Sequence, residues 1–247
     1  MRKRQRPTAL VISCEHGGND IPPAFASLFA GKERRARVAS HRGWDPGAAE
    51  LAADIVMALG VPSHVCRTTR LLIEVNRSLH HRRLFSDLSR DLPEAQRSAL
   101  IEQIWRPYRE AVTREIAAHV AAGRDVLHVL VHSFTPELDG EVRNADVALL
   151  YDPSRSREVM WVEHWRPLLQ AADERLRIRR NYPYRGTADG FEVALRRQFA
   201  DPHYSGITIE VNQAFPLGRA RRWREVRATI VATIEQLAEL AATGSAR

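Results

Sequence analysis

Hydrophobic residues occur along this chain both as short runs and as longer stretches of helical periodicity, and the two kinds alternate. Short runs rich in Val, Ile and Leu that end in Gly or polar residues indicate strands buried on both faces. Alternating strands and helices predict an α/β fold, here a three-layer α/β/α arrangement with a mostly parallel or mixed central sheet. The predicted strands are 8–13, 62–67, 71–75, 126–131, 145–150 and 206–211, and the predicted helices are 46–59, 93–122, 157–176, 189–199 and 223–242.

Two of these helices carry boundary signals. The helix 46–59 begins at a proline, with Asp45 as a candidate N-cap and Gly60 as the residue that ends it. The longest stretch, 93–122, contains Pro107, and we expect a bend there because proline lacks the amide donor that a helix interior needs.

The sequence contains no internal repeat and no Gly/Ser-rich linker, and 247 residues fit one large domain. We therefore predict a single domain over 1–247, with 1–6 and 244–247 frayed. Two cysteines make no disulfide framework, which suits a reducing compartment. The apolar stretch behind the basic N-terminus is too short for a signal peptide, and no run approaches the roughly 20 residues of a membrane span. These features predict a cytoplasmic protein without a membrane partner.

The net charge is +7 at pH 7, from 37 Lys and Arg against 30 Asp and Glu. A basic surface can bind nucleic acid, but the arginine clusters here are scattered and few aromatic residues lie among them for base stacking. A positive field suits a small anionic substrate equally well. We expect the small anion and not a nucleic acid.

Three of the apolar runs lead to residues that can handle metals or protons. His16 follows the first run, His132 follows the run 126–131, and Glu210 ends the run at 207–209. Ligands of open α/β sheets gather beyond the carboxyl ends of the strands, so these side chains are expected at one place. Zinc in hydrolases commonly has three N or O protein ligands and one position for water. His16 and His132 are therefore predicted metal ligands.

The third ligand is left open by the sequence. Asp45 is our first choice, although an Asp before Pro is also typical of a helix cap. Glu15 is the alternative, although neighbours in an extended segment point to opposite faces. The remaining candidates are Asn19, His41 and a water molecule.

Glu210 lies within an apolar strand, where an isolated carboxylate is costly unless it is paired or functional. One explanation is a salt bridge with one of the many arginines. The functional explanation is a general base beside a metal-activated water.

Two polar segments offer groups for substrate binding. Asn76 and Arg77 end the run 71–75, and a guanidinium can bind a carboxylate bidentately. The alternative is that Arg77 merely pairs with Glu74 or a surface acid. The segment 181–186 contains Tyr184 and Arg185, of which Arg185 could be merely solvated.

Together these segments resemble the N-formylglutamate amidohydrolase family. The matching pieces occur in family order and span most of the chain. They are SCEHGG (13–18), IP (21–22), GWDPGA (43–48), EVNRS (74–78), HSF (132–134), NYPYRG (181–186) and IEVNQ (209–213).

The same order looks like a distant version of the zinc carboxypeptidase and aspartoacylase group. The resemblance implies that His16 and His132 hold zinc, that Asn76 with Arg77 binds the substrate carboxylate, and that Glu210 is the base. The chain departs from that group at Asn19, because the group places a Glu three residues after its first His.

We therefore expect one divalent metal ion, of the zinc type, and a hydrolase of small N-acyl acidic amino acids, N-formyl ones in particular. In the expected mechanism zinc activates a water molecule and Glu210 acts as the base. The alternatives are a carboxypeptidase-type metallopeptidase, and a basic non-catalytic binding protein with an incomplete metal site.

Overall fold

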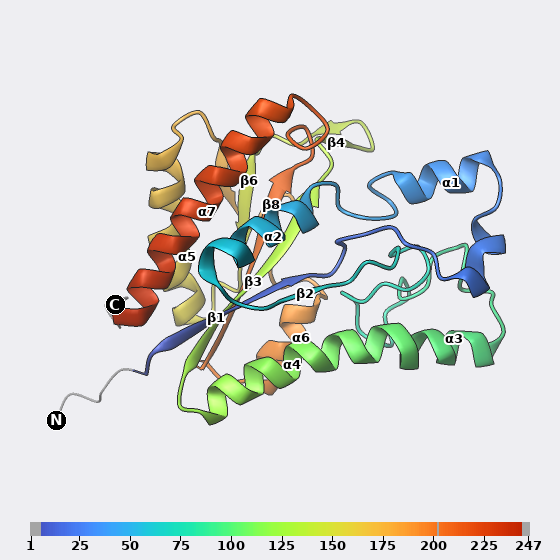
Figure 1. Cartoon of the computed structure of the whole chain (residues 1–247), viewed down its shortest axis with the longest axis horizontal. Helices are drawn as coiled ribbons and strands as arrows, with labels where there is room; N and C mark the ends of the chain where they lie inside the picture. Colours follow the sequence, from blue (N-terminus) through green and yellow to red (C-terminus); the bar gives the residue numbers. More distant parts are fainter. Residues whose placement is uncertain (1–5, 202, 244–247) are drawn as a thin grey trace.

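A six-stranded sheet forms the centre of the computed structural model, which describes residues 6–201 and 203–243 (Figure 1). Its strand order is β2-β1-β3-β8-β6-β7. All neighbouring pairs are parallel except β6 with β8, so the sheet is mostly parallel but mixed, as predicted. The predicted fraying falls on residues outside those described, apart from Arg6. The strands are β1 (Thr8–Cys14), β2 (Ser63–Val65), β3 (Asp125–Phe134), β6 (Val147–Leu150), β7 (Ile178–Arg180) and β8 (Tyr204–Asn212), and a separate hairpin joins β4 (Glu137–Leu138) to β5 (Glu141–Val142).

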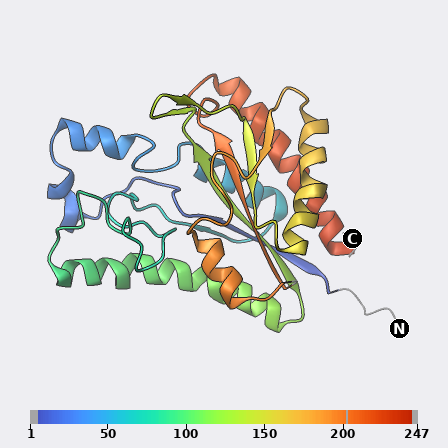
Figure 2. The ribbon, with the colours of Figure 1, turned by 180° about the vertical axis from the view of Figure 1, so that it is seen from behind.

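Helices cover both faces of the sheet (Figures 1 and 2). On one face lie α2 (Ala48–Leu59), α5 (Ser156–Ala172) and α7 (Ala220–Thr243), and on the other lie α4 (Arg106–Ala121) and α6 (Phe191–Gln198). The remaining helices, α1 (Lys32–Ala39), α3 (Glu94–Leu100) and the 3₁₀ helix η1 (Pro23–Phe29), belong to a lateral extension. Among the described residues, no helix combines the length and the apolar composition that crossing a membrane requires.

The alternation of side chains along the strands explains why the sheet is buried on both faces. Leu10 and Ile12 of β1 pack into the core beneath α2, α5 and α7, whereas Val11 packs into the core beneath α4 and α6. In β3 the odd positions from Leu127 join the first core, and Val126 and Leu130 join the second. Successive side chains of a strand point to opposite faces, so each apolar run supplies both cores.

The prediction of a strand at 71–75 is wrong. These residues form turns, although most of their side chains are buried in the apolar cluster of the lateral extension. Their backbone groups are bonded locally instead of to a neighbouring strand: the N–H of Leu72 donates to the carbonyl of Thr69, and the hydroxyls of Ser86 and Ser89 donate to the carbonyl of Leu71. Because those groups are satisfied in this way, a sheet ladder is not needed.

The boundary predictions had mixed outcomes. Asp45 does not cap α2, because the N-cap is Gly47, in the left-handed region at φ 82°, and no side chain caps the helix. The stretch 93–122 is helical, but the part before Pro107 is a π-helical segment, η2 (Ile101–Trp105), that joins α3 to α4. Such a segment accommodates a residue that cannot donate to the regular helical ladder.

A buried ion pair connects α5 to α6. The carboxylate of Glu158 is fully buried and accepts from Arg196 Nε at 2.8 Å and from Nη2 at 2.9 Å. It also accepts from the backbone N–H groups of Gly206 and Asp152. The pair therefore fixes the start of β8 and the helix α6, whose first turn reaches the site described below.

Replacing Glu158 with Ala should destabilise the fold by about 3–5 kcal/mol, because the guanidinium of Arg196 would remain buried without its counter-charge. Glu163→Ala on the same helix is the control: Glu163 pairs with Arg180, is half exposed, and should cost less than about 1 kcal/mol. Urea unfolding followed by circular dichroism measures both. Equal losses in the two variants would contradict this interpretation.

Candidate active site

A cavity of about 280 Å³ lies at the carboxyl ends of β1, β3 and β8. Histidines, acids and arginines line it, so it is far more polar than the cores on either side of the sheet. The lining includes His16, Asp45, Arg70, Asn76, Arg77, Arg83, His132, Tyr184, Arg185, Asp189, Gly190, Glu192, Thr208 and Glu210.

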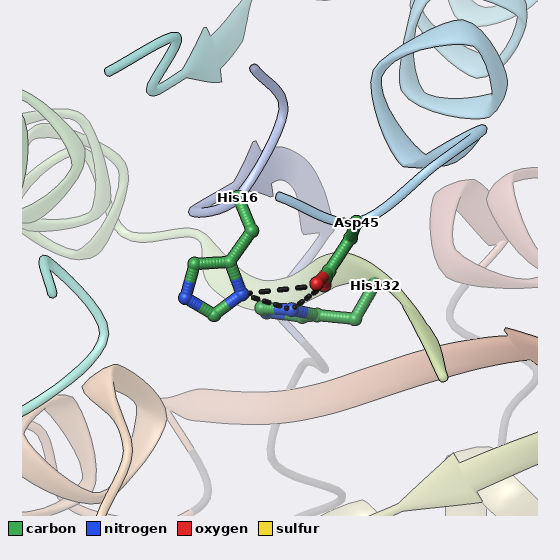
Figure 3. A group of neighbouring side chains, drawn as sticks. All are labelled: His16, Asp45 and His132. Carbon is green, nitrogen blue, oxygen red and sulfur yellow. Dashed lines mark hydrogen bonds and ion pairs between the residues drawn. The ribbon is translucent and has the colours of Figure 1, made fainter. Parts of the chain in front are cut away.

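Three of these side chains converge on one point (Figure 3). His16 follows β1, Asp45 precedes α2, and His132 lies near the carboxyl end of β3. The Nδ1 atoms of the two imidazoles are 3.1 Å apart, and Oδ2 of Asp45 lies 3.2 Å from the first and 2.9 Å from the second. All three side chains are buried. The structure thus brings both predicted histidines and the first choice for the third ligand together.

This group fits a metal ion in its donor atoms and its spacing. Two imidazole nitrogens and one carboxylate oxygen form the donor set of many catalytic zinc sites. Bonds of about 2.0–2.1 Å in tetrahedral geometry place ligand atoms about 3.3 Å apart, close to the 2.9–3.2 Å found here. The two Nδ1 atoms also face each other, an arrangement that needs a proton or a cation between them. The group can therefore hold a metal ion.

Carboxylates lie behind both histidines. Nε2 of His16 lies 2.5 Å from Oε1 of Glu74, and Nε2 of His132 lies 2.9 Å from Oε2 of Glu15. Each imidazole can donate its Nε2 proton to the acid, which leaves the Nδ1 lone pair free toward the shared point. Carboxylates in this position orient metal-binding histidines and fix their tautomer.

Carboxylates outnumber guanidinium groups around the point where His16, Asp45 and His132 meet. Hydrogen bonds and neighbouring positive charges outweigh the opposing effect of burial, and they lower the pKa of Glu15 to about 2 and those of Asp45 and Glu74 further below their usual range. Arg70 bonds Glu74 at 2.7 Å and Asp45 at 3.3 Å. Three carboxylates and one guanidinium leave two negative charges on these groups. Despite burial, Asp45 and Glu15 raise the pKa of His132, so its imidazole holds a proton that a divalent cation would displace.

Glu15 is held by a chain of buried polar groups that reaches across the second core. Its Oε1 accepts from the hydroxyls of Ser13 at 2.7 Å and Tyr108 at 2.8 Å. His128 Nε2 lies 2.8 Å from the Ser13 hydroxyl, and its Nδ1 lies 2.9 Å from that of Tyr204. Glu15 points away from the metal point toward these partners, so its geometry suits a support for His132 rather than a ligand.

Glu210 lies directly beside His132, because the two residues are register partners in the parallel strands β8 and β3. Its side chain is 6 % exposed, and Oε2 has no hydrogen-bond partner. Burial, together with the nearby charge of Asp45, raises the pKa of Glu210 to about 7. The salt bridge with an arginine that the sequence left open is absent from the described residues. A buried acid with a free oxygen and a pKa near neutrality is suited to proton transfer.

Asn76 and Arg77 line the cavity but are also fixed from behind. The Asn76 Oδ1 accepts from the N–H of Phe191 at 2.8 Å, and Arg77 Nη1 donates to the carbonyl of Asp189. Both thus bind the start of α6. The backbone N–H of Arg77 donates to the carbonyl of Glu74 at 3.1 Å. Among the described residues its guanidinium makes no ion pair with the Glu74 carboxylate, which bonds Arg70 and His16 instead.

Tyr184 and Arg185 lie at the rim. Tyr184 is 42 % exposed and its hydroxyl accepts from Arg143 at 3.0 Å, while Arg185 is exposed. Asn19 donates to the carbonyl of Val38 at 3.4 Å, and His41 is half-buried. Neither Asn19 nor His41 belongs to the converging group.

Sequence reasoning did not assign a role to Glu74, although the signal was present. Glu74 interrupts an apolar run in the same way as Glu210, and a carboxylate in such a run must be paired or functional. Arg70 and Arg83 line the cavity as well. No pattern in the sequence distinguished these two from the other arginines.

Comparisons with known proteins agree with the resemblance seen in the sequence. The family model described as N-formylglutamate amidohydrolase matches residues 8–216. A gene product from Agrobacterium tumefaciens has a similar crystal structure, with a TM-score of 0.74, 24 % identity and coverage of 96 % of this chain and 92 % of its own. The N-formylglutamate amidohydrolase from Ralstonia eutropha JMP134 gives a TM-score of 0.74 at 17 % identity, covering 98 % and 96 %. At these identities the two structures show a shared fold. A search of curated proteins gave no match.

The raised pKa of Glu210 makes the stability of the metal-free protein depend on pH. The folded state holds the proton up to about pH 7, whereas an unfolded Glu loses it near pH 4.5. Stability should therefore fall as pH rises across this window, by about 3 kcal/mol. Glu210→Gln should remove this fall. The free energy of unfolding of the variant, relative to that of the wild type, should therefore increase from the acidic to the neutral end of the window. Urea titrations of chelator-treated protein across the window measure the difference, and parallel pH curves for the two proteins would refute it.

Proposed function

The chain belongs to the N-formylglutamate amidohydrolase family, and from this and the geometry of the site we propose that it is a metal-dependent hydrolase of a small N-acyl acidic amino acid, specifically an N-formyl one. The observation that carries the proposal is the meeting of His16, Asp45 and His132 beside the unpartnered oxygen of Glu210. The proposed metal is a single divalent ion of the zinc type, with these three residues as its ligands.

Each residue has a proposed task. A bound zinc-type ion would lower the pKa of a water molecule and polarise the acyl carbonyl. Glu210 would take the proton of that water at its free Oε2 and deliver it to the leaving nitrogen. Glu15 and Glu74 would keep the Nδ1 atoms of the two histidines directed at the shared point.

The substrate is proposed to be held by the inner pair Asn76 and Arg77, with Tyr184 and Arg185 at the rim. Among the described residues, the Arg77 guanidinium has one hydrogen bond, to the carbonyl of Asp189, which leaves the two donors that bidentate contact with a carboxylate needs. A cavity of about 280 Å³ suits a small acid better than a peptide chain, which disfavours the metallopeptidase alternative.

The non-catalytic alternative required an incomplete metal site. Three buried donors within 4.8 Å of one another argue for a complete set. A cytoplasmic location and the lack of membrane or nucleic-acid partners remain predictions from the sequence.

Two variants test the metal and the base separately. His132→Ala should lose most of its zinc and its activity, since loss of one of three ligands is rarely compensated. Glu210→Gln should keep its zinc but lose about 100-fold or more in kcat, the scale of lost general base catalysis. The assays are metal content by mass spectrometry and release of formate from N-formyl-L-glutamate.

His164→Ala is the control for the metal assay, because His164 lies on α5, where its Nδ1 hydrogen-bonds the carbonyl of Met160 at 2.8 Å, and it does not line the cavity. It should keep both zinc and activity. The proposal fails if His132→Ala retains full metal content, or if wild-type protein loaded with zinc releases no formate.

Arg77→Lys should lower kcat/KM for N-formyl-L-glutamate by about 30-fold or more, because Lys cannot reproduce the bidentate contact and the buried carboxylate is left poorly matched. The loss should be much smaller for analogues in which a carboxamide replaces the carboxylate. Arg82→Lys, at an exposed position that does not line the cavity, is the matched control and should have little effect. Equal losses on acid and amide would assign Arg77 a purely structural role.

A further inference from the structure

Glu192 is a buried acid that lines the cavity but has no task in the proposed catalytic set. It lies in the first turn of α6, its exposed fraction is 6 %, and it shares the cavity with His132 and Glu210. Within the described part of the chain, no other residue makes a hydrogen bond or ion pair with its carboxylate, although His132 and Arg196 act on it through their charges.

The cation nearest in sequence cannot serve as its partner. Arg196 lies one helical turn after Glu192, but its guanidinium binds Glu158 through Nε and Nη2 and also donates to the carbonyls of Gly186 and Gly206. Burial raises the pKa of Glu192 accordingly. Its own backbone N–H is the hydrogen-bond donor that the described residues give this carboxylate. Burying a carboxylate with so few partners costs free energy, and a donor supplied by a ligand would offset that cost.

Gly190 makes room for this carboxylate at the cavity wall. A Cβ atom added to Gly190 would lie 2.5 Å from Oε2 and 2.8 Å from Oε1 of Glu192. The backbone of Gly190 is extended, at φ −156°, so any residue could adopt its conformation. A glycine is therefore needed at this position to leave space for the Glu192 carboxylate, and not to allow the backbone conformation. Gly190 itself lines the cavity, which places the Glu192 carboxylate at the surface that a ligand meets.

The groups given a task above leave the amide N–H of the substrate without an acceptor before the C–N bond breaks. An N-acyl acidic amino acid offers two carboxylates, an acyl carbonyl and an amide N–H. Arg77, Arg83 and Arg185 suit the carboxylates, and the converging group at His16 and His132 suits the carbonyl. The nitrogen is the one donor of the substrate, and it needs an acceptor.

We propose that Glu192 binds the substrate nitrogen, accepting a hydrogen bond from the amide N–H before hydrolysis and from the ammonium group of the amino acid after the C–N bond has broken. The inference rests on the proposed function and deepens it. It makes Glu192 the residue that distinguishes an amino acid from a plain dicarboxylate of the same length.

Binding of L-glutamate and of glutarate, which lacks the amino group, tests this inference. With zinc-loaded wild-type enzyme in isothermal titration calorimetry, glutamate should bind about tenfold tighter or more, because the bond between ammonium and carboxylate is charge-assisted. In Glu192→Gln most of that preference should be lost, while the affinity for glutarate should stay within about threefold. A preference that persists in Glu192→Gln would overturn the inference and assign the nitrogen to Glu210 or the metal.

Two further variants separate position from charge. Gly190→Ala keeps the acid but pushes its carboxylate away, so it should also reduce the preference for glutamate. Asp189→Asn is the matched control: Asp189 lines the same cavity, but its Oδ2 accepts from the N–H of Ser78 at 3.3 Å, and the preference should remain. Loss of the preference in Asp189→Asn alone would also overturn the inference.

Failure of the proposed function gives a different result. In that case the zinc-loaded wild type would release no formate from N-formyl-L-glutamate and would bind neither ligand, which overturns both statements. Formate release together with an unchanged preference in Glu192→Gln overturns only the inference.

Discussion

The hydrogen bonds from the histidine Nε2 atoms to Glu74 and Glu15 decide where the two Nδ1 atoms point, and the rest of the site depends on that direction. An imidazole that donates from Nε2 keeps its Nδ1 lone pair for a Lewis acid. The acids that fix this tautomer are buried and ionised, and Arg70 balances only one of them. Despite its burial, the Asp45 and Glu15 carboxylates raise the pKa of His132, so a proton on this imidazole balances a second charge in the metal-free site. A dication bound at this group would replace that proton, and its binding would then be energetically coupled to folding of this region.

The register of the sheet makes this arrangement possible. His132 and Glu210 are partners across β3 and β8, so a shift of one residue would turn one of them into the opposite core. The run Leu127–Val131 alternates between two packed cores, and Ile207 and Ile209 both pack into the first core, so both strands resist such a shift. Apolar packing therefore determines the positions of the polar groups at the strand ends. Glu158 adds a polar anchor at the opposite end of β8, through the N–H of Gly206.

The α/β class, most strands and the meeting of His16 with His132 could be predicted, because buried parallel strands have a simple pattern and their carboxyl ends meet at one edge. The turns at 71–75 could not be predicted. Side-chain hydroxyls there satisfy part of the backbone of a buried apolar run, and such a run has the same sequence pattern as a buried strand. Asp45 was ambiguous, since Asp before Pro is typical of a cap, and only the left-handed Gly47 shows that the helix begins without one. Glu74 and Arg70 meet the site through long-range contacts that leave no local spacing to read.

The inner and outer parts of the cavity differ in how freely they can change. Asn76 and Arg77 are bonded to the start of α6, so a substitution there disturbs both the cavity and a helix terminus. Tyr184 and Arg185 sit on an exposed loop, and surface substitutions rarely cost more than about 0.5 kcal/mol. Residues at the rim can therefore change without loss of stability, while changes of the inner pair are constrained by the helix that they hold. Sequence differences between related proteins of this fold should therefore appear first in the loop that carries residues 184 and 185.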